Sequence, residues 1–483
     1  MYGNIRVGIK NLFQCLLLIT IASILVFFGA DGWMISSVCV WSILLFLCFK
    51  NIRINCWYFF FLISFFVFLM SGDIAEVLFG KHYYLQFGDE ANIHAHKCLL
   101  ISLLAMWFGY VVTSVKAKNR NKYFRKVSNS DETINGIRKF SKLAYIIAYI
   151  LILINTIDTI RFVASYGYIS YYTSYNSILP SVLIEIGEFV PLALCIYLST
   201  FPTKKESSLM IKSFLLYSFL TLLIGTRSGI IYNTIFIICY SLYRNYTDEG
   251  KAVWISKRMI CILVLSIPFL LSFLFLYEYI RTGRNVEFVS FGSTIVDFFV
   301  NIGASSKVIK YGYEYADKIP KWNFYSLGET LNYFKYGTLF NLFDLSDIPA
   351  RHTAQFALES HSFGELISYL AIPQNYLKGN GTGSSFIAEL YADFGYIGVA
   401  LGSLIYGWIF KKISYISNNH WLSTAMKLFV FLSLLSAPRA SFDSFIAAIV
   451  NVNNIMFIFL VYLFAQSTSG GASNQLLGKK VSS

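Results

Sequence analysis

Charged residues are scarce in this sequence. Asp, Glu, Lys and Arg together make up 13% of its 483 residues, whereas 56% are hydrophobic and 18% are aromatic. The mean hydropathy is +0.58, and a soluble domain of this size needs far more charge to cover its surface. The composition therefore excludes a soluble protein and indicates an integral membrane protein.

Motifs for nucleotides, metals and disulfides are also missing. The sequence has no phosphate loop of the Walker type, no GxSxG and no paired His/Cys spacing that would hold a metal. All eight cysteines lie in or at the edge of apolar runs, so no disulfide framework is visible. We therefore expect neither a metal nor a cofactor.

Long apolar runs, in contrast, are abundant. A membrane-spanning helix needs about 20 mostly apolar residues, and the sequence predicts an all-α, polytopic membrane protein with about twelve such helices. The first run follows "MYGNIRVGIKN" without a small-residue cleavage site, so we interpret it as a retained helix rather than a signal peptide. The predicted spans lie near residues 12–29, 33–49, 56–72, 98–115, 143–160, 181–201, 209–225, 228–243, 259–277, 384–410, 421–437 and 443–465.

Basic residues are distributed unevenly over the connections between these spans. Most of the 39 Lys and Arg lie in the two tails and in alternate connections, with the densest block at "KAKNRNKYFRK" (116–126). The positive-inside rule places these segments in the cytoplasm and the remaining connections outside. This asymmetry explains the net charge of +13 without a nucleic-acid partner.

One external connection is much longer than the others. Residues 278–383 separate nine predicted spans in residues 1–277 from three in residues 384–483, which also include a cytoplasmic tail. Aromatic residues at helical spacing, as in "YGYEYADKIPKWNFYSLGETLNYFKYGTLFNLF", predict amphipathic helices at the membrane surface. We expect a large external loop domain, whose aromatic residues serve either interfacial packing or contact with sugar rings.

Arginines lie at the predicted external ends of three hairpins. Arg227 is in "IGTRSGII", Arg281 and Arg284 end the ninth span in "LFLYEYIRTGRN", and Arg439 is in "SAPRASFDSF". Snorkelling to the interface explains any one of them. Three such sites on the side with few cations favour an anion site, because a guanidinium binds phosphate oxygens in pairs. The pattern predicts a site for a lipid-linked pyrophosphate.

Acid/base candidates occur on the same side. His361 in "LESHSFGELISYL" is the more attractive histidine, although a lone histidine in a loop is usually inert. Glu389 and Asp393 stand one helical turn apart at the mouth of the tenth span, where they are either functional or simply a polar start of a helix. The candidates are His352, His361, Glu278, Glu365, Glu389, Asp393 and Asp443.

The order of "IGTRSGII", the long external segment, "GNGTGSSFIAELYADFGYIGVALGSLIYG" and "APRASFDSF" resembles that of the Wzy-type O-antigen (oligosaccharide repeat-unit) polymerases. This resemblance, which covers most of the chain, implies a GT-C-like glycosyltransferase of the bacterial inner membrane with its active site facing the periplasm. Its substrates would be undecaprenyl-pyrophosphate-linked oligosaccharides, and its partners a chain-length regulator and a flippase.

The resemblance also implies roles for individual residues. It implies that the functional arginines are Arg227, Arg281 and Arg439. From the residues themselves we expect Glu389 and His361 to be catalytic as well, and the following to contact substrate: Arg284, Asp393, Asp443, Tyr277 and Arg161. The related O-antigen ligases carry a histidine near the end of the long loop, which residues 375–388 lack. A carboxylate, Glu389 by preference, or His361 would then deprotonate the acceptor.

Two alternatives remain open from the sequence. An O-antigen ligase differs from a polymerase only in its acceptor. A flippase or other transporter would be expected to place charges near the bilayer midplane, in broken helices and two related halves. Here the charges lie at one leaflet and the long external segment breaks any two-half symmetry.

Overall fold

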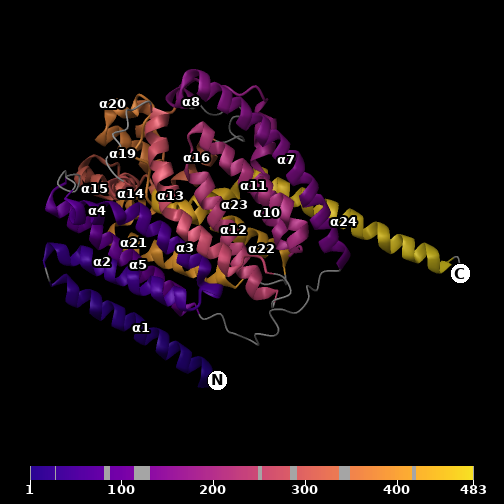
Figure 1. Cartoon of the computed structure of the whole chain (residues 1–483), viewed down its shortest axis with the longest axis horizontal. Coiled ribbons are helices and arrows are strands. Elements are labelled where there is room, and N and C mark those ends of the chain that lie inside the picture. Colours follow the sequence, from indigo (N-terminus) through magenta and orange to yellow (C-terminus); the bar gives the residue numbers. More distant parts are fainter. Residues whose placement is uncertain are drawn as a thin grey trace. The chain divides into compact units, whose positions relative to one another are not determined.

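The computed structural model consists of helices joined by turns and loops (Figure 1). It describes residues 2–27, 29–80, 87–113, 131–248, 253–282, 291–336, 349–415 and 420–481, and none of these residues lies in a β-strand. The chain divides into two compact units. Unit 1 comprises residues 1–116, 257–415 and 433–447, and unit 2 comprises residues 117–256, 416–432 and 448–483.

Nine helices in the described residues are long and apolar enough to cross a membrane, or ten if a bent pair of helices is counted as one span. The protein is therefore a polytopic membrane protein, and its described residues contain nine or ten candidate spans rather than the twelve or so predicted from the sequence. The described apolar part of α1 (Tyr2–Val26) is only Phe13–Val26. Tyr, Asn and Arg side chains interrupt the apolar run of α12 (Ser228–Thr247). The bent pair is α23 (Ser444–Val450) and α24 (Val452–Val481), which meet at 52°.

Unit 1 is built around α5 (Asp89–Val112) and α21 (Phe386–Ser414), which pack along each other. Glycines allow this approach, because a Cβ atom on Gly109 would collide with the Leu404 carbonyl and one on Gly407 with the Met106 carbonyl. The helices α2 (Ala30–Lys50) and α3 (Ile52–Leu69) lie alongside (Figure 1). α13 (Lys257–Thr282) also belongs to this unit.

The described residues of the segment 278–383 give no evidence of a large loop domain. They belong to unit 1, where α15 packs on α5 and α21, and α14 packs on α4 (Ser71–Phe79). The expected domain is not evident because amphipathic helices need an apolar surface, and the spanning helices supply it. The helices of this segment are α14 (Phe291–Ile302), α15 (Ser306–Glu314), α16 (Gly328–Tyr336), α18 (Ala354–Glu359), α19 (Phe363–Ala371) and α20 (Pro373–Tyr376).

A buried ion pair attaches this segment to the spans. Lys310 Nζ of α15 lies 2.8 Å from Asp73 Oδ1 of α4, and the two side chains are 1% and 5% exposed. Ser306 Oγ donates to the same oxygen at 3.2 Å. His96 Nε2 of α5 lies 3.5 Å from Asp73 Oδ2. Asp73 therefore connects three elements of unit 1.

Unit 2 is organised by the long helix α7 (Asp131–Tyr166), against which α9 (Ser181–Glu188), α10 (Val190–Ser199), α11 (Lys204–Ile224) and α24 pack, whereas α12 packs on α11. α9 and α10 together form one candidate span. A short turn joins α11 to α12. The other helices are α8 (Tyr168–Ser174) and α22 (Trp421–Ser436), the second of which continues into unit 1.

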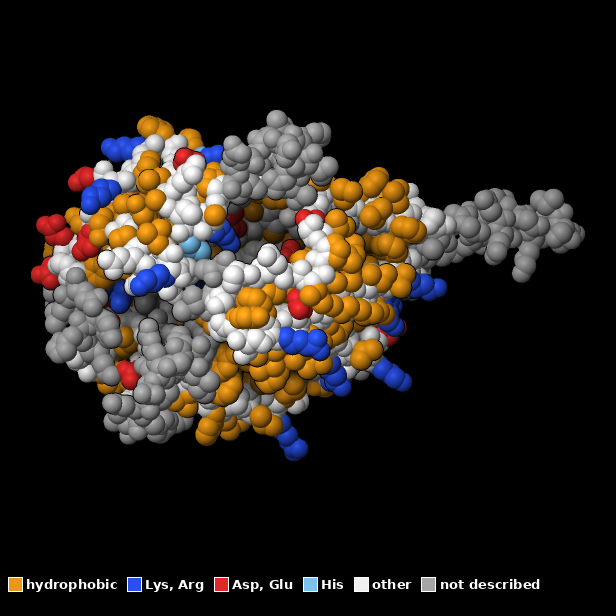
Figure 2. Space-filling model, turned by 90° about the horizontal axis from the view of Figure 1, so that it is seen from above, with side chains coloured by type: hydrophobic (Ala, Val, Ile, Leu, Met, Phe, Trp, Pro, Cys, Tyr) orange, Lys and Arg blue, Asp and Glu red, His pale blue; other side chains and the backbone are white. Residues whose placement is uncertain are grey.

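Exposed side chains on the long helices are largely apolar. Ile262 and Phe269 of α13 are 66% and 70% exposed, and Ile397 of α21 is 72% exposed. Hydrophobic side chains cover wide areas of the face seen in Figure 2. Such exposure is unusual for a protein in water and fits helices surrounded by lipid.

Candidate active site

A hollow of about 410 Å³ in unit 1 collects several of the predicted site residues. Its wall comes from the starts of α16 and α21, from α19 and the glycine-rich segment before α21, and from the turn after α22. The lining is almost entirely polar or glycine. The lining residues are Gly328, Glu329, Asn332, His352, His361, Ser362, Gly364, Glu365, Ser368, Gly381, Gly383, Ser384, Glu389, Arg439, Ala440 and Ser441.

Glycines let the backbone segments of this wall approach one another. A Cβ atom on Gly364 would lie 3.0 Å from the Gly383 carbonyl oxygen. Gly379 and Gly383 have φ values of 93° and 78°, a region that other residues rarely adopt. The Thr382 amide donates to Ser368 Oγ at 2.9 Å. The sequence "GNGTGSS" is therefore glycine-rich because its backbone folds tightly against α19.

Glu389 is held at the floor of the hollow by three donors. Its side chain is buried in the first turn of α21, and Ser384 Oγ donates to Oε1 at 2.6 Å. Ser441 Oγ and the Phe442 amide donate to Oε2 at 2.9 and 2.8 Å. Both carboxyl oxygens are thus engaged by protein groups, and Glu389 fixes the turn after α22 against α21.

Asp443 is fully buried and joins the same turn to the segment 278–383. Its carboxylate accepts hydrogen bonds from the backbone N–H groups of Glu329 and Thr330 at 3.3 and 2.8 Å, at the start of α16. It also accepts from Ser441 Oγ at 2.8 Å. A carboxylate in this position satisfies free N–H groups of a helix start and interacts favourably with the helix dipole. Asp443 thereby places Glu329 at the hollow.

Asp393, one turn after Glu389, makes a similar attachment outside the hollow. Its two oxygens accept from the backbone N–H groups of Tyr325 and Ser326 at 3.0 and 2.7 Å. These residues begin the short 3₁₀ helix Tyr325–Leu327, directly before α16. Asp393 and Asp443 therefore both attach the segment 278–383 to the ends of spans.

His361 has one ring nitrogen fixed and the other available. Its Nδ1 lies 2.7 Å from the Asn323 carbonyl oxygen, and its backbone N–H donates to Asn332 Oδ1 at 3.0 Å. Because a carbonyl can only accept, Nδ1 carries the hydrogen in the neutral ring and Nε2 keeps its lone pair. His361 therefore lines the hollow in the tautomer that can accept a proton through Nε2.

Arg439 brings a positive charge to the same hollow. It ends the short 3₁₀ helix Ala437–Arg439, and its side chain is exposed. A Cβ atom on Gly383 would lie 3.8 Å from Arg439 Cγ and Nε, so this glycine lies directly beside the Arg439 side chain. Within the described part of the chain the guanidinium makes no hydrogen bond or ion pair. It is therefore available to an anionic ligand.

One comparison with known proteins identifies the family of this chain. The family model described as O-antigen polysaccharide polymerase Wzy matches residues 9–470. The chain belongs to this family. No curated protein and no solved structure matches it. The chain is therefore a polysaccharide-polymerising enzyme with several membrane spans, and the resemblance seen in its motifs is confirmed.

The hollow of this Wzy-family chain gathers three of the five predicted catalytic residues, Arg439, Glu389 and His361. Arg227 is half-buried in the turn between α11 and α12 and belongs to unit 2. Arg161 is exposed near the end of α7, also in unit 2. Tyr277 is half-buried near the end of α13, where it stacks on Phe273 with ring centroids 6.0 Å apart. The side chains of Glu278 and Arg281, and all of Arg284, lie outside the described residues.

Sequence reasoning did not name Glu329, Ser384 or Ser441. The two serines lie inside the motifs that carried the resemblance, so their position was an available signal. Glu329 had no such signal, because only the packing of α16 brings it to the hollow. Its side chain is open toward the hollow, yet the surrounding protein atoms raise the pKa of Glu329 above that of a free glutamate, mainly by desolvation.

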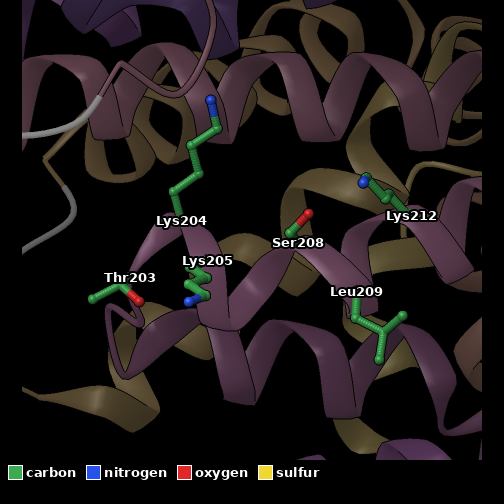
Figure 3. A pocket seen from close by; sticks show the side chains of 6 residues that line it. All are labelled: Thr203, Lys204, Lys205, Ser208, Leu209 and Lys212. Atoms are coloured by element: carbon green, nitrogen blue, oxygen red, sulfur yellow. The ribbon is translucent and has the colours of Figure 1, made fainter.

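A larger hollow of about 680 Å³ lies at the start of α11 (Figure 3). It is lined by Thr203, Lys204, Lys205, Ser208, Leu209 and Lys212. These residues provide no carboxylate and no histidine. The turn with Arg227 follows the other end of this 21-residue helix, ~30 Å along its axis. We do not assign catalysis to this hollow, because its lysines are those that the positive-inside rule places in the cytoplasm.

Metal ligands do not gather in the described residues, where no group of three or more His, Cys, Asp or Glu side chains has the arrangement of a metal site. Among the residues that line the hollow, Arg439 carries a positive charge.

Proposed function

We propose that this chain transfers a growing glycan from undecaprenyl pyrophosphate to the terminal sugar of a second lipid-linked unit, in the hollow of unit 1. One observation carries the proposal: His361, whose Nε2 keeps its lone pair, and Arg439, whose guanidinium is free, are residues that line the same hollow. The match to the Wzy family favours this transfer over a ligase or a flippase reaction.

The reaction needs a base and a group that accepts negative charge. An acceptor hydroxyl attacks the anomeric carbon of the donor, and the bond from that carbon to the pyrophosphate oxygen breaks. The hydroxyl proton passes to His361 Nε2, while the bonding electrons leave with undecaprenyl pyrophosphate, which pairs with Arg439. A positioned base contributes roughly 10²–10⁴-fold to such a step. A guanidinium aimed at the developing charge supplies electrostatic stabilisation.

His361 suits the role of base better than Glu389. The two oxygens of Glu389 already accept three hydrogen bonds from Ser384, Ser441 and Phe442, so a substrate hydroxyl would have to displace one of them. We therefore assign Glu389 a positioning role.

The hollow would face the periplasm, because the basic residues gather in the connections on the opposite side of the spans. A flippase would deliver the lipid-linked units to that side, and a chain-length regulator would act on the product. Arg227, Arg281 and Arg284 would add to pyrophosphate binding. Because arginines supply the positive charge, we expect transfer to continue in excess chelator.

The test uses the full chain in lipid nanodiscs with lipid-linked repeat units, and polymer length is measured on a gel. His361→Gln should slow polymerisation at least 100-fold, within the range expected for loss of a general base. The exposed His420, which does not line the hollow, provides the matched control His420→Gln. Full polymer from His361→Gln would overturn the assignment of the base, and no polymer from the unmodified chain would overturn the proposed function.

A further inference from the structure

We infer that the hollow binds the terminal sugar of the acceptor and selects a sugar without a carboxylate, either neutral or bearing an amino group. This inference rests on the proposed function and names the substrate class of the same site. A volume of about 410 Å³ lies within the usual range of ligand pockets, roughly 300–1,000 Å³.

The charges of the lining residues carry the inference. Glu329, Glu365 and Glu389 supply three carboxylates, and Arg439 is the cation among the residues that line the hollow. If Arg439 pairs with the pyrophosphate of the donor, the space left for the acceptor is surrounded by negative charge. A carboxylate on the acceptor sugar would then be desolvated beside like charges, which disfavours its binding.

Arg351, which lies outside the hollow, compensates only in part for the negative charge of the carboxylates that line it. Arg351 Nε lies 3.9 Å from Glu365 Oε1, beyond hydrogen-bond distance, and the Arg351 side chain is 77% exposed. Solvent screens an ion pair of this kind strongly. Glu365 itself is 16% exposed, so its charge acts mainly on the interior of the hollow.

The polar groups of the hollow also fit a hydroxyl-rich ligand. Glu329 and Asn332 come from α16, whereas Glu365 and Ser368 come from α19, so acceptors and donors line the hollow from two different helices. A carboxylate offers two oxygens to neighbouring hydroxyl groups. These groups can bind the hydroxyl groups of a sugar, or an ammonium group, without a cationic partner.

The first experiment determines the repeat unit. A strain that lacks this polymerase should accumulate lipid-linked or surface-attached single units, and the terminal sugar at their non-reducing end is identified by mass spectrometry and NMR. We expect a neutral or amino sugar at that end. A terminal uronic acid or other acidic sugar would overturn the inference and leave the proposed function untouched.

The second experiment measures the effect of a negative charge on the acceptor sugar alone. The terminal sugar of the purified lipid-linked unit is oxidised at its primary hydroxyl to a carboxylate, and a portion is converted to the uncharged carboxamide of the same shape. The full chain in nanodiscs should use the carboxylate at least tenfold more slowly than the carboxamide. Equal rates for the two would overturn the inference. Failure to polymerise even the unmodified unit would overturn the proposed function instead.

Variants test which residues cause the preference for an uncharged acceptor. Glu365→Gln and Glu329→Gln, singly and together, should reduce the preference for the carboxamide over the carboxylate by several-fold, because the amide keeps the shape and removes the charge. An unchanged preference in the double variant would contradict the assignment to these two residues. The comparison of the two acceptors in the unmodified chain does not depend on how the variants fold.

Discussion

Glu389 and Asp443 share one hydrogen-bond donor. The Ser441 hydroxyl oxygen lies 2.9 Å from Glu389 Oε2 and 2.8 Å from Asp443 Oδ1. A hydroxyl has a single proton, so it donates fully to only one of the two carboxylates. Both oxygens of Asp443 also accept backbone N–H groups, whereas Glu389 Oε1 faces a hydroxyl, Ser384 Oγ, which can itself accept. Glu389 Oε1 is therefore the one of these carboxylate oxygens whose only partner can accept as well as donate a hydrogen bond.

This relationship predicts that the two corresponding amides behave differently. In Glu389→Gln the amide NH₂ can donate to Ser384 Oγ, so thermal stability should change little. In Asp443→Asn an NH₂ group would face a backbone N–H group at the start of α16. We expect a loss of about 1–3 kcal/mol, the cost of a buried polar group left unpaired. Thermal melting of the two purified variants in the same detergent measures the difference.

A comparison of Glu389→Gln with His361→Gln separates a positioning role of Glu389 from a role as the catalytic base. We expect Glu389→Gln to polymerise at least tenfold faster than His361→Gln. If Glu389→Gln abolished polymerisation at an unchanged melting temperature, Glu389 would be the base and His361 would not.

The ion pair between Lys310 and Asp73 should be a strong determinant of stability. Both side chains are buried, so Lys310→Met leaves Asp73 as an uncompensated charge. Removing one partner of a buried pair costs about 3–5 kcal/mol. The exposed Lys335, whose Nζ donates to the Glu359 carbonyl, provides the matched control Lys335→Met, with an expected loss below about 1 kcal/mol. Equal melting temperatures for the two variants would show that the buried pair contributes nothing.

Stability should also fall as the pH rises, because the Glu76 carboxyl group lies near the pair of Lys310 and Asp73. Burial, and secondarily the Asp73 carboxylate, raises the pKa of Glu76 from 4.5 to about 7. A raised pKa means that the folded state binds the proton more tightly than the unfolded state does. The stabilisation is therefore complete below about pH 4.5 and is lost as the pH rises through about 7. Melting temperatures between pH 5 and pH 8 should show a smaller decline in Glu76→Gln than in the unmodified chain.

The sequence predicted some parts of this molecule better than others. The all-helical membrane class follows from composition, because no soluble core could bury so many apolar side chains. The hydropathy of a run does not reveal whether a helix continues through it, so the break at Asn451 and the polar side chains of α12 were missed. His361, Glu389 and Arg439 were each recognisable within a short motif. Their meeting in one hollow was not, because it depends on how α16 and α19 pack on the spans.

Orientation across the membrane remains a prediction from the distribution of charge. A cysteine at Asn323, beside the hollow, should react with a membrane-impermeant maleimide in cells whose outer membrane alone is permeabilised. The eight native cysteines are first replaced by serine or alanine, and the background is checked to be unlabelled. Labelling only after the inner membrane is opened would place the hollow in the cytoplasm and remove the basis of the pyrophosphate assignment.

The final prediction concerns the choice of arginine at Arg227 and Arg439. If these side chains only reached toward lipid headgroups, lysine would serve equally well, because both side chains extend to the interface. A bidentate contact with phosphate oxygens, in contrast, needs the planar fork of a guanidinium. Such a charged contact is worth roughly 1.5–3 kcal/mol, and each 1.36 kcal/mol corresponds to a tenfold change in rate.

We therefore expect Arg227→Lys and Arg439→Lys each to slow polymerisation on the order of tenfold, and the alanine variants to slow it further. Arg53, exposed at the start of α3 on the predicted cytoplasmic side, provides the control Arg53→Lys, which should leave the rate unchanged. The rate is measured with the full chain in nanodiscs at equal protein amounts, and melting temperatures exclude misfolding. A normal rate for both lysine variants would leave snorkelling as the sufficient explanation of these arginines, whereas a loss at Arg439 alone would confine pyrophosphate binding to unit 1.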